Sequence, residues 1–420
     1  MYVISLLYLC VWTVLGDSRA DLATFFTNFA LTSCHINVRI KAMYTSNDTT
    51  FMGLALQEAK KGMGYTSPNP LVGAVVVKND QIIGRGYHKQ HGTPHAEVNA
   101  LADCADQGHD PTGATMYVTL EPCAHTGKTP PCTLAVIQAG IKRVVIASRD
   151  PNPQASGGAA VLQAMGIDVS VGVLEQEALA LNEIFFHYIT TGRPFVLQKY
   201  AMTLDGKIAT HTRASKYITS GESLARVHLD RLKHSAIMVG VGTVIADDPS
   251  LTCRLPDDSP YIARNPIRIV CDTHLRTPLD SQVIRTARET PTLIATCNTD
   301  AGVAKPFLDA GAHLVHVPPI IVKETNTLDL CALMETLGKR GIDSILLEGG
   351  AALHWSALHS GIVNKINAYI APKVFGGEQA KGPVGGLGVE TPDSAFLFDN
   401  VRYIPLGQDL LVEAVPRVRN

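Results

Sequence analysis

The chain of 420 residues is 46% hydrophobic and 18% charged, and 36 Lys and Arg against 38 Asp and Glu give a net charge of −2. This composition excludes wholesale disorder, predicts about two to three domains and argues against a basic nucleic-acid-binding surface. No apolar run reaches the roughly 18–20 residues of a membrane-spanning helix, and nine cysteines are too few for a disulfide scaffold. We therefore expect a globular, cytoplasmic protein that binds neither membrane nor nucleic acid.

The N-terminal segment is unusual. Residues 1–16 form an apolar run of signal-peptide length, but no Lys or Arg precedes Arg19, whereas a secretory signal begins with a positive segment. Three interpretations stay open. The segment is a signal or anchor, a disordered or loosely docked tail, or the product of a start assigned too far upstream, with the true start at Met43 or Met52. We treat residues 1–50 as an N-terminal extension.

Beyond this extension, the hydrophobic pattern predicts strands that alternate with short helices. The predicted helices span residues 52–61, 96–105, 131–139, 157–165 and 175–190, and the predicted strands span 71–77, 81–88, 115–120, 144–147 and 169–173. Such alternation favours a layered α/β domain over residues 51–192. The sequence Thr191-Gly192-Arg193-Pro194 then interrupts the pattern and marks the expected domain boundary.

One histidine and two cysteines of this domain have the chemistry of a zinc site. His95 and Glu97 form an H-x-E motif, and Cys123 and Cys132 follow it. One imidazole and two thiolates leave the fourth position of tetrahedral zinc open, as catalytic zinc sites require. His95 would enter a helix whose first turn carries Glu97, and a proline pair would start another helix at Cys132, where a helix N-terminus favours the thiolate. Glu97 is then the expected proton carrier, as in zinc nucleobase deaminases.

The spacing departs from the general deaminase motif, because eight residues rather than two separate the cysteines. Chance core residues, or a structural zinc completed by His91 or His125, are the alternatives to a catalytic zinc site. Asn69, followed by a proline before a predicted strand, either begins that strand with a turn or reads the edge of a flat heterocycle with its amide.

In the second domain, residues 193–420, predicted strands also alternate with predicted helices. Its predicted strands span 195–202, 236–241, 268–271, 292–295, 314–317 and 344–347, and its predicted helices span 222–234, 330–338 and 351–359. Gly349-Gly350 lies between a strand and a helix, where the backbone can approach a phosphate. The G-x-G-x-x-G dinucleotide fingerprint is absent, and the sequence Gly240-Val241-Gly242-Thr243 taken alone favours a buried strand with a tight turn.

Longer motifs identify a family. The sequence E-P-C-A-H-T-G-K-T-P-P-C at 121–132 and D-P-N-P at 150–153 resemble the bifunctional riboflavin-biosynthesis deaminase–reductases, as do L-D-G-K-I-A at 204–209, A-D-D-P at 246–249, L-E-G-G at 347–350 and A-P-K at 371–373. The resemblance runs from residue 52 to the C-terminus. It implies a cytidine-deaminase-like three-layer α/β domain followed by a dihydrofolate-reductase-like α/β domain. It also implies zinc-dependent deamination of a diaminopyrimidinone ribosyl phosphate, followed by NADPH-dependent reduction of the ribose to ribitol. Family members are often oligomers, so self-association is an open expectation.

The resemblance further implies site residues in the second domain. The positions that match NADPH contacts are Ala201, Tyr217, Thr243 and Asp247, with Gly349, Gly350, Ala351, Ala352, Leu353 and His354 at the phosphate end. The positions that match substrate contacts are Ser215, Arg231, Leu251, Arg254 and Glu348, together with Asn69 in the first domain, and Lys199 is a further candidate near the sugar. Forked guanidinium groups suit a ribose-linked phosphate, although either arginine taken alone could form a surface ion pair. Tyr217 stands where the family commonly has Trp and keeps an aromatic face.

Two alternatives belong to other functional classes. The first is a cytidine or tRNA-adenosine zinc deaminase with an accessory C-terminal domain. The net charge and the wide cysteine spacing argue against it. The second is a non-catalytic metal-binding protein that retains a degenerate domain, and the intact Glu97 and the open coordination position argue against that.

Overall fold

The computed structural model of the chain describes residues 45–125, 130–322 and 325–417. The interpretations of residues 1–44 lie outside this range, and so do residues 126–129 between the two cysteines. Ser46–Asn420 forms one compact unit. No helix in the described ranges is long and apolar enough to cross a membrane.

The first part of this unit contains a five-stranded sheet with the order β2-β1-β3-β4-β5. Its strands are β1 (Gly73–Lys78), β2 (Gln81–Tyr87), β3 (Thr115–Leu120), β4 (Arg143–Ser148) and β5 (Asp168–Val171). Its helices are α3 (Ser46–Lys60), α4 (Ala96–Asp106), α5 (Cys132–Gln138), α6 (Gly158–Ala164), α7 (Glu175–Leu181) and α8 (Glu183–Thr191). Strand β1 is antiparallel to both of its neighbours, whereas β3, β4 and β5 are parallel. The expected alternation of strands and helices is confirmed.

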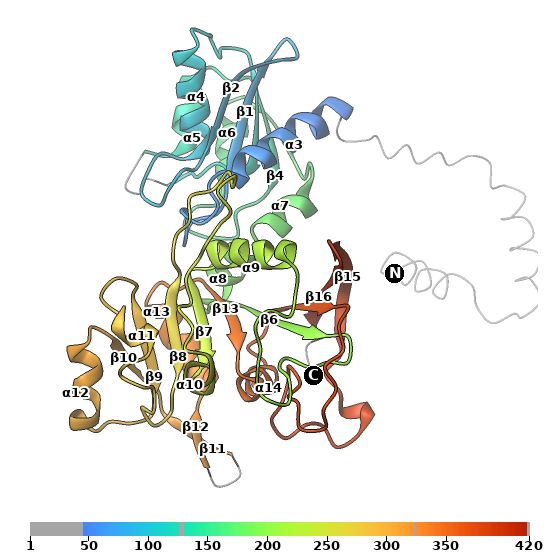
Figure 1. Cartoon of the computed structure of the whole chain (residues 1–420). Coiled ribbons are helices and arrows are strands. Elements are labelled where there is room, and N and C mark those ends of the chain that lie inside the picture. Colours follow the sequence, from blue (N-terminus) through green and yellow to red (C-terminus); the bar gives the residue numbers. More distant parts are fainter. Residues whose placement is uncertain (1–44, 126–129, 323–324, 418–420) are drawn as a thin grey trace, which may run out of the picture. The chain divides into compact units, whose positions relative to one another are not determined.

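Helices cover both faces of this sheet (Figure 1). Helices α4, α5 and α6 share a hydrophobic core with one face, and α3 and α7 pack on the other. Two glycines allow the close approach. A Cβ atom on Gly86 would lie 2.2 Å from the amide nitrogen of Ala100 in α4, and one on Gly73 would lie 2.0 Å from the carbonyl oxygen of Ala55 in α3. These contacts hold the beginning of α4 against the sheet.

Two helices differ from their predicted bounds. The helix predicted over 175–190 is divided into α7 and α8 at Asn182, because the buried Asn182 amide accepts a hydrogen bond from the Leu71 backbone N–H at 2.8 Å and donates to its carbonyl at 2.9 Å. Helix α3 begins at Ser46, six residues earlier than predicted. Its buried Asp48 pairs with Arg143 at 2.7 Å, so the first turn of α3 belongs to the packed domain.

The second part of the unit is built on a nine-stranded sheet with the order β10-β9-β8-β7-β13-β6-β14-β16-β15. These strands are β6 (Phe195–Thr203), β7 (Ala236–Gly240), β8 (Ile267–Cys271), β9 (Thr292–Thr296), β10 (His313–His316), β13 (Ser344–Gly349), β14 (Lys365–Ala371), β15 (Phe398–Leu406) and β16 (Asp409–Pro416). The sheet is parallel from β10 to β14, whereas β16 is antiparallel to β14 and β15. Strands β11 (Pro319–Val322) and β12 (Thr325–Leu328) form a separate pair.

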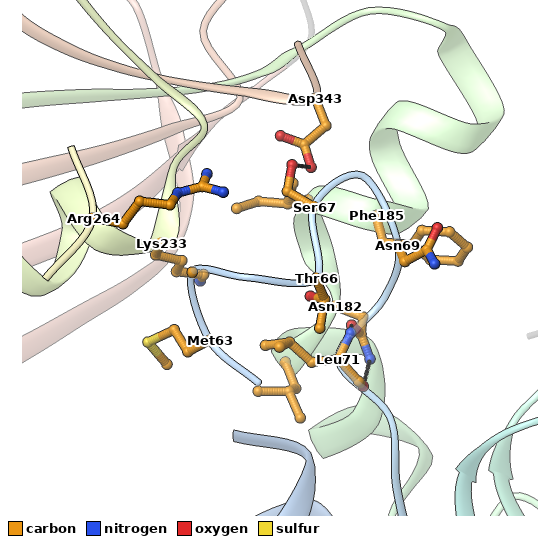
Figure 2. A pocket seen from close by; sticks show the side chains of 13 residues that line it. Met63, Thr66, Ser67, Asn69, Leu71, Asn182, Phe185, Lys233, Arg264 and Asp343 are labelled. Carbon is orange, nitrogen blue, oxygen red and sulfur yellow. Dashed lines mark hydrogen bonds between the residues drawn. The ribbon is translucent and has the colours of Figure 1, made fainter. Parts of the chain in front are cut away.

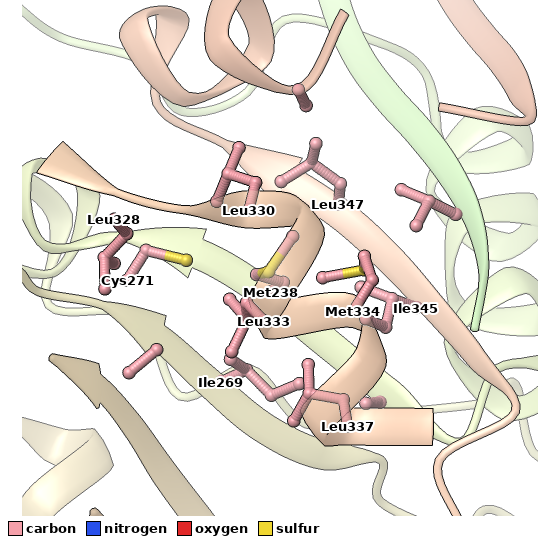
Figure 3. Close-up of a cluster of buried hydrophobic side chains, with 14 of the residues drawn as sticks. Met238, Ile269, Cys271, Leu328, Leu330, Leu333, Met334, Leu337, Ile345 and Leu347 are labelled. Atoms are coloured by element: carbon pink, nitrogen blue, oxygen red, sulfur yellow. The ribbon is translucent and has the colours of Figure 1, made fainter. Parts of the chain in front are cut away.

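Helices also cover both faces of this sheet. They are α9 (Gly221–Lys233), α10 (Val241–Asp247), α11 (Gln282–Arg285), α12 (Ala301–Asp309), α13 (Leu330–Lys339) and α14 (Ala351–His359). Figure 3 shows Leu333 and Leu337 of α13 packed over Met238 and Ile269, in the core that α13 shares with α14. The opposite face packs against α10, α11 and α12. Because β7, β13 and β6 are parallel neighbours, their carboxyl ends and the segments that follow them lie along the same edge of the sheet.

Candidate active sites

The structure brings the three predicted zinc ligands together. His95 is the N-cap residue of α4, Cys132 is the first residue of α5, and Cys123 lies in the segment after β3. Nδ1 of His95 is 3.2 Å from Sγ of Cys132 and 3.7 Å from Sγ of Cys123. The three ligand atoms all lie within 4.8 Å of one another. The two cysteines are separated by eight residues in sequence but lie close in space, because the end of β3 and the start of α5 meet beside the start of α4.

This donor set fits zinc. One imidazole nitrogen and two sulfurs are ligands that zinc prefers. The backbone N–H of Cys132 also donates a hydrogen bond to Sγ of Cys123 at 3.3 Å. A hydrogen bond from the Cys132 thiol, together with that backbone bond, holds the pKa of Cys123 well below that of a free thiol and favours its thiolate form. The same thiol bond and burial raise the pKa of Cys132, contrary to the thiolate expected there.

Glu97 lies in the first turn of α4, beside this cluster. Its side chain is buried and interacts with Cys132 and His95. Burial raises the pKa of the Glu97 carboxyl. A carboxyl group in such surroundings can hold a proton and release it to a neighbouring group.

Asn69 is oriented by a histidine that the sequence analysis did not identify. The ring nitrogen Nδ1 of His88 lies 3.2 Å from the carbonyl oxygen of Pro94, which can only accept, so Nδ1 carries the proton. Nε2 then accepts from Nδ2 of Asn69 at 3.1 Å. Burial lowers the pKa of His88 and so keeps its imidazole neutral. The arrangement leaves Oδ1 of Asn69 available, and the His88 ring lies 5.4 Å from that of His95. The only sign in the sequence that could have pointed to His88 is its place at the end of the strand predicted over 81–88.

A pocket lined in part by the loop that carries Asn69, and by Asn69 itself, is shown in Figure 2. Residues of both predicted domains line it, among them Lys233 and Arg264 of the second. The Ser67 hydroxyl donates to Oδ2 of Asp343 at 2.6 Å across it. Neither the predicted zinc ligands nor Glu348 lines this pocket. We therefore interpret it as a hollow at the domain junction rather than as the catalytic cleft.

The second site contains a buried ionic cluster of three residues from three elements. Arg231 of α9 binds Glu348 of β13 with two hydrogen bonds of 2.6 and 2.8 Å, and Nζ of Lys199 on β6 lies 3.5 Å from the same carboxylate. The Glu348 side chain is only 6% exposed. Burial alone would raise the pKa of Glu348, but Arg231 and Lys199 outweigh it and lower the pKa to about 2. The carboxylate is thus ionised at any physiological pH.

The 249–254 loop joins this cluster. Arg231 donates through Nη1 to the carbonyl oxygen of Thr252 at 2.8 Å. Nη1 of Arg254 donates to the hydroxyls of Thr252 and Ser250 at 2.8 and 3.2 Å. The fork of Arg231 is therefore already occupied, whereas Arg254 is exposed and bonded only to neutral side-chain groups. Of the two predicted phosphate-binding arginines, Arg254 has the guanidinium that is available to an anion. Leu251 is buried in the hydrophobic core that it shares with α10.

The phosphate end of the predicted NADPH site lies at the N-terminus of α14. Gly349 ends β13, and a Cβ atom there would lie 3.1 Å from Oγ1 of Thr243. Gly350 has a φ of 89°, which favours glycine. The first turn of α14 contains Ala351, Ala352 and Leu353, and the buried His354 follows; among the described residues, its Nε2 has no hydrogen-bond partner. A glycine cradle at a helix N-terminus fits a dinucleotide phosphate.

The remaining predicted residues lie around these two groups. Oγ of Ser215 donates to Oδ1 of Asp247 at 3.1 Å, so a predicted substrate contact is joined to a predicted cofactor contact. Ala201 follows Lys199 on the same face of β6. Tyr217 is 73% exposed, and its segment is held by Lys373, which donates to the carbonyl oxygen of the next residue at 2.7 Å.

Comparisons with known proteins agree with this geometry. A family model described as the cytidine and deoxycytidylate deaminase zinc-binding region matches residues 45–148, and one described as the RibD C-terminal domain matches residues 194–412. The riboflavin biosynthesis protein RibD of Actinobacillus pleuropneumoniae is 49% identical over 373 residues, which cover 88% of this chain and 96% of that protein. That of Aquifex aeolicus is 44% identical over 366 residues, covering 87% and 97%.

A crystal structure from Thermotoga maritima, described as a diaminohydroxyphosphoribosylaminopyrimidine deaminase/5-amino-6-(5-phosphoribosylamino)uracil reductase, has a TM-score of 0.76 and 38% identity, covering 88% of this chain and 99% of that one. Both domains match in the same order along nearly the whole length of these relatives. The similarities therefore favour a deaminase joined to a reductase over a cytidine or tRNA-adenosine deaminase with an accessory domain.

Proposed function

Because the chain belongs to the RibD family of bifunctional riboflavin-biosynthesis deaminase–reductases, we propose that its two sites act in series. The first hydrolytically deaminates 2,5-diamino-6-(5-phosphoribosylamino)pyrimidin-4(3H)-one. The second uses NADPH to reduce the ribosyl group of 5-amino-6-(5-phosphoribosylamino)uracil to ribityl. The observation that carries the first reaction is the convergence of His95, Cys123 and Cys132 beside the buried Glu97.

In the deaminase site, we assign zinc binding to His95, Cys123 and Cys132. Bound zinc supplies a water that is acidic enough to act as a nucleophile near neutral pH. Glu97 accepts a proton on its carboxylate and donates it to the amine that leaves the pyrimidine ring. The amide of Asn69, oriented by His88, accepts a hydrogen bond from the edge of the ring through Oδ1. The loop that carries Asn69 thus binds the pyrimidine ring, while Glu97 in the first turn of α4 transfers the proton.

In the reductase site, NADPH supplies the hydride that reduces the first carbon of the opened sugar. The glycine pair and the first turn of α14 bind the cofactor phosphates, and Tyr217, Ala201, Thr243 and Asp247 line the rest of the cofactor site. Lys199 and Glu348 face the sugar, and Ser215 and Leu251 complete the substrate contacts. Arg254 binds the phosphate, whereas Arg231 positions Glu348 and the 249–254 loop.

Three further assignments accompany this function. We place the domain boundary between residues 192 and 193, in the connection from α8 to β6. We propose a cytoplasmic location, which is consistent with the unpaired cysteines among the described residues. Binding of small molecules rather than nucleic acid is consistent with the net charge of −2, and self-association stays a prediction.

The test follows both products. The purified full chain, loaded with zinc, is given the diaminopyrimidinone ribosyl phosphate with and without NADPH, while ammonia release and NADPH oxidation are measured. We expect ammonia without NADPH, and NADPH oxidation only after deaminated product has formed. Ammonia release with no NADPH oxidation would remove the reductase assignment. Absence of ammonia from zinc-loaded protein would remove the deaminase assignment.

A further inference from the structure

Arg268 on β8 is a buried cation with an unusual set of partners. It is 1% exposed, and its guanidinium donates five hydrogen bonds. Four go to the 286–292 segment: to the Thr292 hydroxyl at 3.0 Å, to the Thr286 hydroxyl and carbonyl at 2.8 and 2.9 Å, and to the Thr290 carbonyl at 2.8 Å. The fifth goes to the carbonyl oxygen of Ser250 at 3.3 Å. None of the acceptors is a carboxylate.

Stability alone gives a weak reason for this arrangement. Removing a guanidinium from water is costly, and apolar side chains of similar volume often replace buried charges without loss of stability. Burial lowers the pKa of Arg268 to about 10, so the group is still charged at neutral pH. The role of Arg268 is therefore better sought in what its hydrogen bonds hold in place.

One of those hydrogen bonds reaches the 249–254 loop, which has a strained conformation. Leu251, the residue after Ser250, has a φ of 53°, which is unfavourable for a residue with a β-carbon. The Ser250 hydroxyl and the neighbouring Thr252 hydroxyl both accept from Nη1 of Arg254. Arg231 also donates a hydrogen bond to the carbonyl of Thr252 in this loop. Ser250 therefore links the two arginines directly: its carbonyl accepts from Arg268 and its hydroxyl accepts from Arg254.

We propose that Arg268 is a positioning residue for the reductase reaction: by holding Ser250 from the buried side, it fixes the 249–254 loop so that Arg254 meets the substrate phosphate. The inference rests on the proposed function, because it takes Arg254 to be the phosphate-binding residue. Arg268 itself does not touch the substrate. It acts only through the conformation of the loop.

The experiment uses the full chain, four single variants and the double variant Arg254→Ala/Arg268→Met. Arg268→Met removes the charge, Arg268→Lys keeps it with fewer donors, and Arg254→Ala removes the predicted phosphate ligand. Val270→Ala is the matched control, because Val270 lies two residues away on the same strand, is fully buried and packs in the core on the face opposite α13. Each protein is assayed for kcat and KM with 5-amino-6-(5-phosphoribosylamino)uracil, KM for NADPH, inhibition by inorganic phosphate, ammonia release and urea denaturation.

We expect Arg268→Met to raise KM for the ribosyl phosphate and the inhibition constant of phosphate by about tenfold, the effect of losing one charge-assisted hydrogen bond. KM for NADPH and ammonia release should stay unchanged. Arg268→Lys should fold and give a smaller increase in KM. In the Arg254→Ala background, Arg268→Met should raise KM no further, because both act through the same contact. Val270→Ala should lower the denaturation midpoint without changing KM.

Two results would overturn the proposal in distinguishable ways. If Arg254→Ala raises KM but neither Arg268 variant does, the positioning role is wrong and the role of Arg254 stands. If Arg254→Ala leaves KM unchanged, the phosphate assignment fails, and this inference fails with it. If Arg268→Met does not fold, Arg268→Lys tests the proposal: a raised KM for the ribosyl phosphate supports the positioning role, and an unchanged KM overturns it.

Discussion

The ion pair between Arg231 and Glu348 should make a large contribution to the stability of the second domain. We predict that Glu348→Gln, which keeps the shape of the side chain and removes its charge, leaves Arg231 and Lys199 as unpaired buried cations. The Glu348 and Arg231 side chains are 6% and 13% exposed, so water can do little to compensate. Removal of one partner from a buried pair costs about 3–5 kcal/mol.

The depressed pKa gives a second estimate of the same magnitude. The difference between the ordinary value of 4.5 and the folded value of about 2 corresponds to about 3 kcal/mol at 1.36 kcal/mol per pKa unit. Because the folded pKa is lower than the unfolded one, this stabilisation is present above pH 4.5 and is lost as the pH falls toward 2. By pH 3, about half of it should remain.

The assay is urea denaturation followed by the fluorescence of Trp355, in a Trp12→Phe background so that one tryptophan reports. At pH 7, Glu348→Gln should unfold with a free energy about 3 kcal/mol lower than its parent, and the difference should narrow toward pH 3. Glu413→Gln is the control, since Glu413 is a buried carboxylate of the same sheet that pairs with Arg226 of α9 and Arg402 of β15; this variant should lose stability but still reduce its substrate. A loss below 1 kcal/mol at pH 7, or one that grows on acidification, would refute the reasoning.

Other substitutions should affect each reaction separately. Glu97→Gln should lower ammonia release at least about 100-fold while zinc, measured by atomic absorption, stays at one per chain; persisting ammonia release contradicts the proton-transfer role. Cys132→Ser should lose zinc but still oxidise NADPH when given the deaminated intermediate. His88→Ala should raise KM for the deaminase substrate about tenfold, because Asn69 is no longer oriented, and His88→Gln should partly restore it. Lys373→Met should raise KM for NADPH about fivefold, since the Tyr217 segment loses its hydrogen bonds, with ammonia release unchanged as the control.

The zinc site could be predicted from sequence because its geometry is local to two helix starts. The H-x-E motif at His95 lies at the entrance of α4, and the proline pair before Cys132 marks the start of α5, so two of the three ligands sit at helix starts that were evident, while Cys123 lies in the segment after β3. The orientation of Asn69 could not be predicted, because it depends on which nitrogen of His88 carries a proton, and the carbonyl of Pro94 decides that.

Elements defined by long-range contacts were not predicted. Helix α10 begins directly after β7 with no capping side chain, so the sequence predicted a strand running into a turn there. Strand β15 is exposed along most of its length and lacks clear alternation, and its pairing with β16 defines it. The break at Asn182 depends on hydrogen bonds to a residue 111 positions away.

Three arginines of the second domain illustrate why residue type and spacing leave the roles of side chains open. Arg231 is buried with a carboxylate partner, Arg268 is buried with neutral partners only, and Arg254 is exposed. The first two each donate one hydrogen bond to a backbone carbonyl of the 249–254 loop, Arg231 to Thr252 and Arg268 to Ser250. The loop is therefore held by two guanidinium groups that are engaged with protein acceptors, which leaves the third available for the phosphate contact that we propose. Sequence predicts a cation at each position, but only burial and hydrogen-bond partners separate the cations that hold the loop from the one that we propose to bind the substrate.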